Sequence, residues 1–340
     1  MVVVETTVIR ILVVALNRFP FGSSEDRITN AGSLFIGRPR FFVVSQLRTN
    51  TDMNDLRRFS LIAFLLVSTS VTHISTAHAQ DGQGQKGADG GFRTHQIRSP
   101  YQARKTKLRI LLPDDFDLRK KHRVLYVLPV HEDGVHKHGD GLVEIKKHGY
   151  HNKHQLICVA PGFTSKSWYA DHDLNSKKRD ESHLLKTVIP FIENRYPVQT
   201  DEKGRLLIGF SKSGWGAAAL LLRNPNVFYR ASAWDVGIRV DTGPIEDAER
   251  AERIAREWGS KKNFEANRLS TLIKTRGKEL GDEARLFYFS TAGRRAIGGV
   301  EIHRLLVEQE IPHRYVLEPR RKHAWDSGWI PEAMAFLVGE

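Results

Sequence analysis

The segment "GRLLIGFSKSGWGAAALLLRN" contains the first residue whose surroundings suit chemistry, Ser211. An apolar run of strand character precedes this serine, and a helical pattern rich in Ala and Leu follows it. A serine at such a strand-to-helix turn, with small residues two before and two after it, has the pattern of a nucleophile elbow. Gly209 and Ser213 hold these two positions. We therefore predict that Ser211 is a nucleophile. The alternative is a serine that caps the helix, a role that Ser213 could also fill.

A serine hydroxyl is a weak nucleophile unless a base takes its proton, so the prediction requires a histidine that folds back beside Ser211. The carboxyl-terminal segment "HRYVLEPRRKHAWDSGWIPEAMAFL" contains a strand pattern, a short loop with His323 and a helical pattern. The chain has 15 histidines, so the position of His323 between the last strand and the last helix is the informative feature. We predict that His323 is the general base. The alternative is a solvent-exposed loop histidine beside three basic residues.

The acid that would orient the histidine is harder to place. After the predicted strand over 284–292, "FYFSTAGRRAIGGVEIH" offers no acidic residue until Glu301, although that loop is the usual place for it. Asp235 ends the preceding strand, "ASAWD", and would project from the same edge of the sheet. We predict that Asp235 is the acid, with Glu301 and Asp326 as weaker options. Asp235 could instead cap a helix or turn at the start of the next segment, and Asp326 could cap the last helix.

An oxyanion needs backbone donors, which at such an elbow are the amide after the nucleophile and one after the third strand. The first is the amide of Lys212. The end of the predicted strand over 123–130 and the loop after it read "VLPVHEDG", so the second amide is that of His131 or Val130. These donors need no special side chain.

Aromatic and polar residues in "SWYADHD", which follows the predicted strand over 156–161, could line a substrate site at this edge. They are Trp168, Tyr169 and His172, and we add Trp215 from the helix that follows the elbow. The alternative is that these side chains pack against the insertion described below.

Residues 131–154 are rich in histidine, which raises the question of a metal. Zinc ligands come from pairs at fixed local spacing or from separate elements around an open site. His136 and His138 are two apart in an expected loop, which we interpret as a solvated loop near the site. We predict neither a metal nor a cofactor.

Strand and helix patterns alternate from residue 105 onwards, and several strands are nearly continuous apolar runs, as in a parallel sheet covered on both faces. This order predicts an α/β fold with a mostly parallel, doubly wound sheet. The predicted strands cover 106–112, 123–130, 156–161, 205–211, 229–235, 284–292 and 313–319. The predicted helices cover about 139–149, 181–195, 213–223, 299–310 and 328–338. Residues 236–283 interrupt the alternation with two charged helical patterns, which predict an insertion that either walls the site or lies at the periphery.

The amino-terminal quarter has the pattern of a targeting segment. A basic pair, a short apolar run and an Ala-x-Ala site predict that residues 53–79 are a secretory signal peptide. The alternative is a helix that stays in the membrane. On the first interpretation translation starts at Met53, and residues 1–52 are a non-native or untranslated leader, with an unusual long leader as the alternative. Residues 80–92 are then a Gly-rich tether, and residues 93–340 form a single domain. The one cysteine, Cys158, lies in an apolar run and is expected to be a buried strand residue.

The formal net charge is +13, from 52 Lys and Arg against 39 Asp and Glu. The basic residues are spread out, with short clusters at 119–123, 177–179 and 320–322. Solvated loops explain these clusters, and attraction to acidic polysaccharide or another anionic surface is the alternative. No aromatic-interleaved basic motif indicates a nucleic-acid partner.

Three segments together, "LLIGFSKSGWG", "ESHLLKTVIPFIENRYP" and "RKHAWDSGW", resemble the putative-esterase branch of the α/β-hydrolases. This group includes S-formylglutathione hydrolase, feruloyl and acetylxylan esterases and mycolyltransferases, and the likeness covers about residues 105–340. The resemblance implies an α/β-hydrolase fold and a serine esterase that needs no cofactor, with Ser211 as nucleophile and His323 as base. The chain departs from the pattern in two places: Pro129-Val130 replaces the usual His-Gly, and the usual Asp after the seventh strand is absent.

These observations predict a secreted or periplasmic serine hydrolase that cleaves carboxylic esters through an acyl-enzyme. Its substrates would be small-molecule or polysaccharide esters, with decorated polysaccharides as one class suggested by analogy. The two departures keep a second hypothesis open, a binding module on a hydrolase scaffold. A third is acyl transfer, with the insertion excluding water. The oligomeric state is left open.

Overall fold

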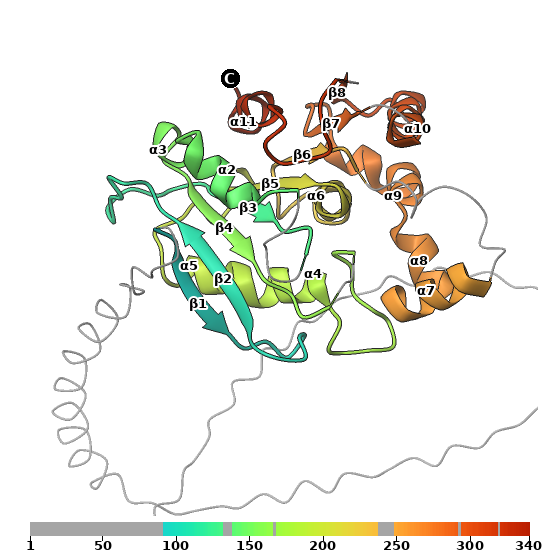
Figure 1. Ribbon diagram of the computed structural model, residues 1–340, viewed down its shortest axis with the longest axis horizontal. Coiled ribbons are helices and arrows are strands. Elements are labelled where there is room, and N and C mark those ends of the chain that lie inside the picture. The colour runs from blue at the N-terminus through green and yellow to red at the C-terminus, as the bar shows by residue number, and fades with distance from the viewer. Residues whose placement is uncertain (1–90, 132–137, 166–167, 237–247, 292–293, 319) are drawn as a thin grey trace, which may run out of the picture. The chain divides into compact units, whose positions relative to one another are not determined.

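The computed structural model describes residues 91–131, 138–165, 168–236, 248–291, 294–318 and 320–340 (Figure 1). The predicted leader and signal peptide, and most of the predicted tether, lie outside the described residues. So do the first residues of the insertion and His136.

Within the described residues, eight strands form one sheet in the order β1-β2-β4-β3-β5-β6-β7-β8. The strands are β1 (Arg93–Ile97), β2 (Thr106–Leu111), β3 (Val124–Leu128), β4 (Ile157–Pro161), β5 (Arg205–Phe210), β6 (Arg230–Trp234), β7 (Leu286–Ser290) and β8 (His313–Leu317). Strand β2 pairs antiparallel with β1 and β4, and every other pairing is parallel. The predicted α/β-hydrolase fold with a mostly parallel, doubly wound sheet is confirmed.

The helices are α2 (Gly141–Lys147), α3 (Tyr150–Lys153), α4 (Asp180–His183), α5 (Ile189–Glu193), α6 (Lys212–Arg223), α7 (Ala248–Trp258), α8 (Lys261–Asn267), α9 (Leu269–Arg276), α10 (Arg294–Glu308) and α11 (Ile330–Val338). A π-helical turn joins α4 to α5, and Pro190 follows this turn. Because Pro190 has no amide hydrogen, the regular bond pattern cannot run through it. The predicted helix over 181–195 is therefore a continuous helical segment in which a π-helical turn separates α4 from α5.

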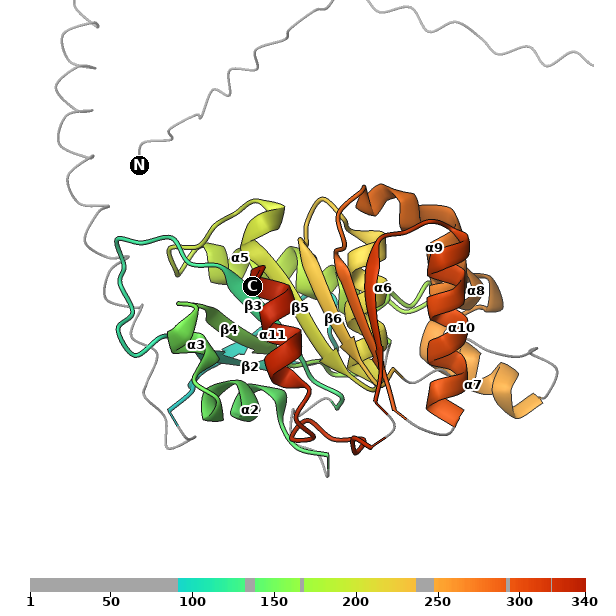
Figure 2. The ribbon, with the colours of Figure 1, turned by 90° about the horizontal axis from the view of Figure 1, so that it is seen from above.

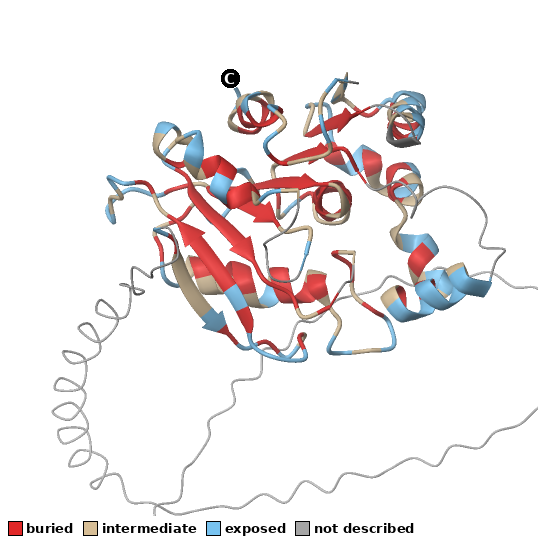
Figure 3. Cartoon of the chain, viewed as in Figure 1, coloured by how far each residue is buried: buried red, intermediate tan, exposed pale blue. Residues whose placement is uncertain are grey.

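Helices cover both faces of the sheet (Figures 1 and 2). The core on one face packs β-strand side chains against the π-helical turn and α5, α6, α9 and α10, and the core on the other face packs them against α2 and α11. Strand β3 shows why its sequence is apolar throughout, since Val124 and Tyr126 belong to the first core and Leu125 and Val127 to the second. Figure 3 shows the central strands buried along their length.

Strand β1 was not predicted. Its sequence, "RTHQI", is polar and only partly buried, because it lies at the edge of the sheet. An edge strand with one half-exposed face lacks the apolar run that identified the other strands. Cys158 is fully buried in β4, as predicted.

The insertion contains three described α-helices, α7, α8 and α9, where two helical patterns were predicted. Trp258 ends α7, and Ser260 caps α8 by accepting a hydrogen bond from the amide of Asn263 at 3.1 Å. A glycine with φ of 92°, Gly259, turns the chain between the two helices. The turn at Gly259 therefore separates the two predicted patterns, and the second of them, "NFEANRLSTLIKTRGKEL", covers most of α8 and all of α9, between which Arg268 is extended.

No helix among the described residues has both the length and the apolar character to span a membrane.

Candidate active site

Ser211 lies at the turn between β5 and α6 with φ of 57° and ψ of −120°. A non-glycine residue adopts this backbone conformation only under strain, and such strain is typical of a nucleophile elbow. The close packing of the turn explains the small residues around it. A Cβ atom at Gly209 would lie 2.0 Å from the carbonyl oxygen of Ser213, and one at Gly214 would lie 2.9 Å from that of Trp234.

Ser213 stands where the motif usually has glycine, and its hydroxyl ties the turn together. Its Oγ accepts a hydrogen bond from the amide of Phe210 at 2.9 Å and donates one to the carbonyl oxygen of Phe210 at 2.9 Å. The side chain is fully buried. Neither serine caps α6: Ser211 occupies the N-cap position without a side-chain capping bond, and Ser213 bonds to the residue before the turn. The structure therefore departs from the capping alternative.

His323 lies between Ser211 and Asp235. Its Nε2 atom is 3.1 Å from the Ser211 hydroxyl oxygen, and a hydrogen bond joins its Nδ1 atom to a carboxylate oxygen of Asp235. Because an ionised carboxylate only accepts, Nδ1 carries the hydrogen, which leaves Nε2 able to accept the proton of Ser211. The imidazole ring packs on Phe210 at 4.4 Å between ring centroids and on His138 at 5.1 Å.

Asp235 follows β6 directly and is 0% exposed. Its amide donates to the carbonyl oxygen of Phe289 on β7 at 3.0 Å. The carboxylate oxygen that does not face His323 accepts from the amide of Thr291 at 3.2 Å and from the Thr291 hydroxyl at 2.8 Å. The two other candidate acids, Glu301 on α10 and Asp326, are exposed and make no hydrogen bond with His323.

Thr291 was missed by sequence reasoning. It follows β7 directly, at the place where the sequence was searched for an acid and none was found. A search of that place for any hydrogen-bond donor would have found it.

The predicted oxyanion donors lie at the ends of neighbouring strands. Lys212 is the first residue of α6, and helix N-termini present amides to negative charge. Val130 and His131 follow β3, which pairs with β5 through Leu128 and Gly209. The Tyr169 hydroxyl donates to the carbonyl oxygen of Pro129 and so holds the start of this loop.

Tyr169 was predicted to line a substrate site, and the structure gives it a different position. Its side chain is 2% exposed, and a Cβ atom at Gly216 of α6 would lie 2.2 Å from its ring. Burial raises the pKa of its hydroxyl well above the ordinary value, so that it stays a donor. Tyr169 thus joins the end of β3 to α6, which carries the elbow.

Trp168, Trp215 and His172 were also predicted as substrate residues, and the structure places all three in packing contacts. The Trp215 ring is fully buried and meets Trp168 at 5.8 Å and Trp258 at 5.4 Å, edge to face. Trp168 Nε1 donates to Glu257 on α7 at 2.8 Å. His172 is 8% exposed and packs beside Gly259. The alternative stated for these residues describes them better, since they pack the insertion against the domain.

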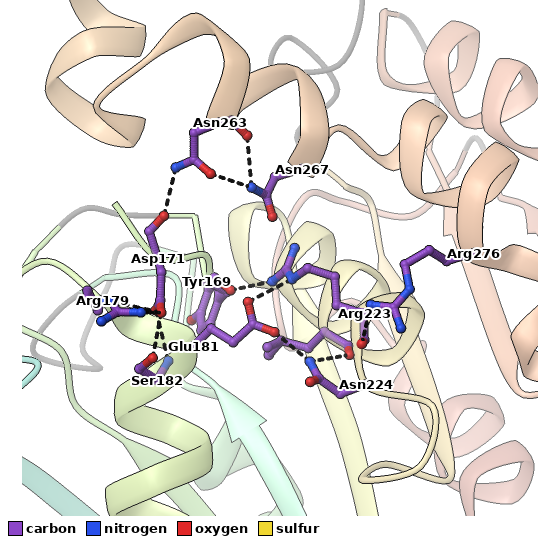
Figure 4. A network of polar contacts seen from close by, with 11 residues as sticks. Tyr169, Asp171, Arg179, Glu181, Ser182, Arg223, Asn224, Asn263, Asn267 and Arg276 are labelled. Carbon is purple, nitrogen blue, oxygen red and sulfur yellow. Dashed lines mark hydrogen bonds and ion pairs between the residues drawn. The ribbon is translucent and has the colours of Figure 1, made fainter. Parts of the chain in front are cut away.

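Polar contacts fix the insertion further, as Figure 4 shows. The side chain of Asn263 on α8 donates to the carbonyl oxygen of Asp171 at 2.8 Å. Arg276 on α9 donates to the carbonyl oxygen of Arg223 at 2.6 Å, and Arg223 in turn pairs with Glu181 at 2.8 Å. These contacts link α8 and α9 to α4, α6 and the loop after β4. The described helices of the insertion are therefore an integral part of the domain.

The histidine-rich segment contributes one described neighbour to the site, His138, whose ring lies against His323. Among the residues that the structure describes, no three His, Cys, Asp or Glu side chains gather as metal ligands.

The sheet order and the Ser211, His323 and Asp235 contacts define the class: an α/β-hydrolase fold with a nucleophile elbow. The family described as "Putative esterase" matches residues 99–238. A comparison with curated proteins found no match. Many solved structures have this fold, and the three described next are among the most similar.

An S-formylglutathione hydrolase from Staphylococcus aureus is 15% identical, with a TM-score of 0.58 over 73% of this chain and 98% of the other. A ferulic acid esterase is 17% identical, with a TM-score of 0.56 over 73% and 98%. A fluorophosphonate-binding serine hydrolase from Staphylococcus aureus is 15% identical, with a TM-score of 0.57 over 73% and 98%. These three neighbours show the fold, which is the one expected for the putative-esterase branch of the α/β-hydrolases, and the family match over residues 99–238 agrees with it.

Proposed function

We propose that the protein is a serine esterase that uses Ser211, His323 and Asp235. The Ser211 oxygen attacks the ester carbonyl while His323 Nε2 takes the hydroxyl proton, and the buried carboxylate of Asp235 stabilises the imidazolium that forms. The negative oxygen of the tetrahedral intermediate is held by the amides of Lys212 and of Val130 or His131. Collapse of the intermediate expels the alcohol, which receives the proton from His323. Water then repeats the sequence on the acyl-enzyme and releases the acid.

One observation supports this proposal above the others: the unbroken line of contacts from the Ser211 hydroxyl through His323 to a fully buried carboxylate. A capping serine or a solvated loop histidine would have no reason to meet in this way. The contact between Asp235 and His323 also removes one ground for the binding-module hypothesis, which rested in part on the absence of an acid after β7.

The test is intact-mass spectrometry of the purified protein after exposure to a fluorophosphonate. We expect a single adduct on the wild type and none on Ser211→Ala. Ser176→Ala removes an exposed loop serine and is the matched control, which we expect to label as the wild type does. An adduct that persists in Ser211→Ala, or a wild type that takes none, would contradict the proposal and favour the binding module.

Hydrolysis and acyl transfer share the acyl-enzyme and differ in the acceptor. We propose hydrolysis, and turnover of p-nitrophenyl acetate with added alcohol separates the two. A hydrolase releases mostly acetic acid, whereas a transferase releases mostly the new acetate ester. Release of the new ester as the main product at low alcohol concentration would favour acyl transfer.

We also propose that residues 53–79 direct export and that the mature chain begins near Gln80. The basic Arg57-Arg58 pair, the apolar run from Phe59 to Val67 and the site at Ala77–Ala79 support this. Amino-terminal sequencing of the protein from the medium or the periplasm should give Gln80 first. An intact terminus upstream of Met53 would overturn it. Esters outside the cytoplasm, including decorated polysaccharides, are then the accessible substrates.

A further inference from the structure

A hollow of about 670 Å³ lies between the β1–β2 connection and the loop that follows β4. Four basic side chains line it: Arg98, Arg104, Lys105 and Lys177. All four are exposed, and the buried side chains of Ser99 and Gln102 also line it. We call this feature the basic hollow.

Among the described residues that line the basic hollow there is no acidic one, so the lining does not neutralise its charge. In the described part of the chain, the side chains of Arg98, Arg104 and Lys105 have no hydrogen-bond or ion-pair partner, and Lys177 donates only to the carbonyl oxygen of Pro100 at 3.1 Å. Arg223, by contrast, pairs with Glu181 at 2.8 Å. Several like charges around one concavity repel each other, and an anion relieves that repulsion.

The backbone beneath these cations is held by buried polar contacts. Gln102 donates to Asp180 at 3.0 Å and accepts from the amide of Thr164 at 2.7 Å and from its hydroxyl at 2.8 Å. The Ser99 hydroxyl bonds to that of Thr187 at 3.0 Å. The one carboxylate in this set, Asp180, is 2% exposed and lies under Gln102 rather than in the hollow. The loop that carries the cations therefore has a fixed shape before any ligand binds.

The basic hollow lies at the same end of the parallel strands as Ser211. Strand β2 runs antiparallel to β4, with Leu108 opposite Pro161 and Leu111 opposite Cys158. The β1–β2 connection therefore lies where β4 ends, which is the edge at which β5 leads into Ser211. Two strands separate β2 from β5, so the lateral distance is about 14 Å at three strand spacings. A ligand that occupies both places must be an oligomer.

We propose that the basic hollow binds the carboxylate groups of an acidic polysaccharide whose ester groups are cleaved at Ser211; this inference rests on the proposed esterase function. Guanidinium groups pair well with carboxylates, and lysines add charge without demanding one geometry. Single-stranded nucleic acid, the other common polyanion, is bound on stacking aromatic side chains, and no aromatic residue lines the hollow.

The test measures binding apart from catalysis, on the full chain with Ser211→Ala as background. The probes are a fluorescent polygalacturonate oligomer, a neutral xylo-oligomer of the same length and a single strand of DNA of the same charge. We expect the polygalacturonate oligomer to bind most tightly, and to bind more weakly as NaCl rises from about 50 to 500 mM, because salt screens exposed charge.

The decisive variant replaces Arg98, Arg104 and Lys105 with alanine. Each exposed ion pair contributes between about 1.4-fold and about fivefold in affinity, so the loss of three should raise the Kd of the acidic oligomer about 10-fold. The control replaces Lys120 and Lys121, two exposed cations at the opposite edge of the sheet, and should leave that Kd unchanged. Unfolding midpoints of both variants check the fold.

Three results would overturn the inference: a Kd that the triple variant does not change, an equal loss in the control variant, or tighter binding of the DNA or the neutral oligomer. Failure of the proposed function looks different, because it is the absence of a fluorophosphonate adduct on Ser211 in the wild type. A protein that binds the acidic oligomer through these cations but takes no adduct would keep the site and lose the esterase proposal.

Discussion

Replacing Asp235 by asparagine tests the least expected member of the site. Thr291 donates twice to one oxygen of the carboxylate, and asparagine keeps an oxygen there, so the fold around residue 235 should survive. Its amide nitrogen then faces His323 and donates to Nδ1. The ring hydrogen moves to Nε2, which can no longer accept the Ser211 proton. A wrong tautomer of this kind lowers kcat about 10⁴-fold in serine hydrolases, which is about 5.4 kcal/mol of transition-state stabilisation.

The assay is kcat for p-nitrophenyl acetate, together with the second-order rate of fluorophosphonate labelling. Two matched controls, Glu301→Gln and Asp326→Asn, remove the other candidate acids, both exposed, and should change kcat by less than about twofold. Unfolding midpoints check that Asp235→Asn is folded. The reasoning fails if Asp235→Asn keeps more than about a tenth of wild-type kcat, or if Asp326→Asn loses as much.

Three further predictions follow from contacts around the site and in the core. Thr291→Val removes the hydrogen bond from the Thr291 hydroxyl to Asp235, a charge-assisted bond of about 1.5–3 kcal/mol. The kcat of this variant should fall about 10-fold or more, with KM little changed. Thr291→Ser keeps the hydroxyl and should keep most of the wild-type kcat. Tyr169→Phe removes the hydroxyl that donates to the Pro129 carbonyl oxygen. This variant should have a lower kcat and an unchanged rate of substrate binding. An unaltered kcat would show that this hydrogen bond does not position the oxyanion loop. Burial lowers the pKa of His183 from 6.5 to about 4. The unfolded chain therefore takes up a proton below pH 6.5 that the folded chain refuses, and stability falls as pH drops from 6.5 towards 4. Denaturant unfolding at pH 8 and pH 5 should show a loss that is about 2 kcal/mol smaller in His183→Gln than in the wild type.

Sequence alone located the central strands because burial on both faces makes them apolar throughout, as in β3 and β5. The edge strand β1 lacked that signal. Ser211 and His323 could be placed because each sits at a junction that sequence order identifies, between a strand and the next helix.

The residues predicted to line the substrate site show the limit of this reasoning. Trp168 and Trp215 belong to segments at the end of the strands where Ser211 lies, and sequence order correctly suggests this location. Sequence order does not reveal which side of α6 faces α7. The Trp215 side chain lies on that side and contacts Trp258 of α7. A large aromatic residue suits a core as well as a binding site, so only tertiary packing separates the two roles.

The position of the acid could not be decided from sequence, because it depends on which strand ends beside His323. Strands β6 and β7 are parallel neighbours and end at the same edge. A carboxylate after either strand can therefore approach the same imidazole. In this chain the carboxylate that meets His323 follows β6, and the residue after β7, Thr291, donates to that carboxylate. The buried carboxylate needs such donors, since a buried charge without hydrogen bonds is costly. The absence of an acid after β7 and the presence of Thr291 there thus describe one arrangement, in which the carboxylate follows β6 and its hydrogen-bond donor follows β7.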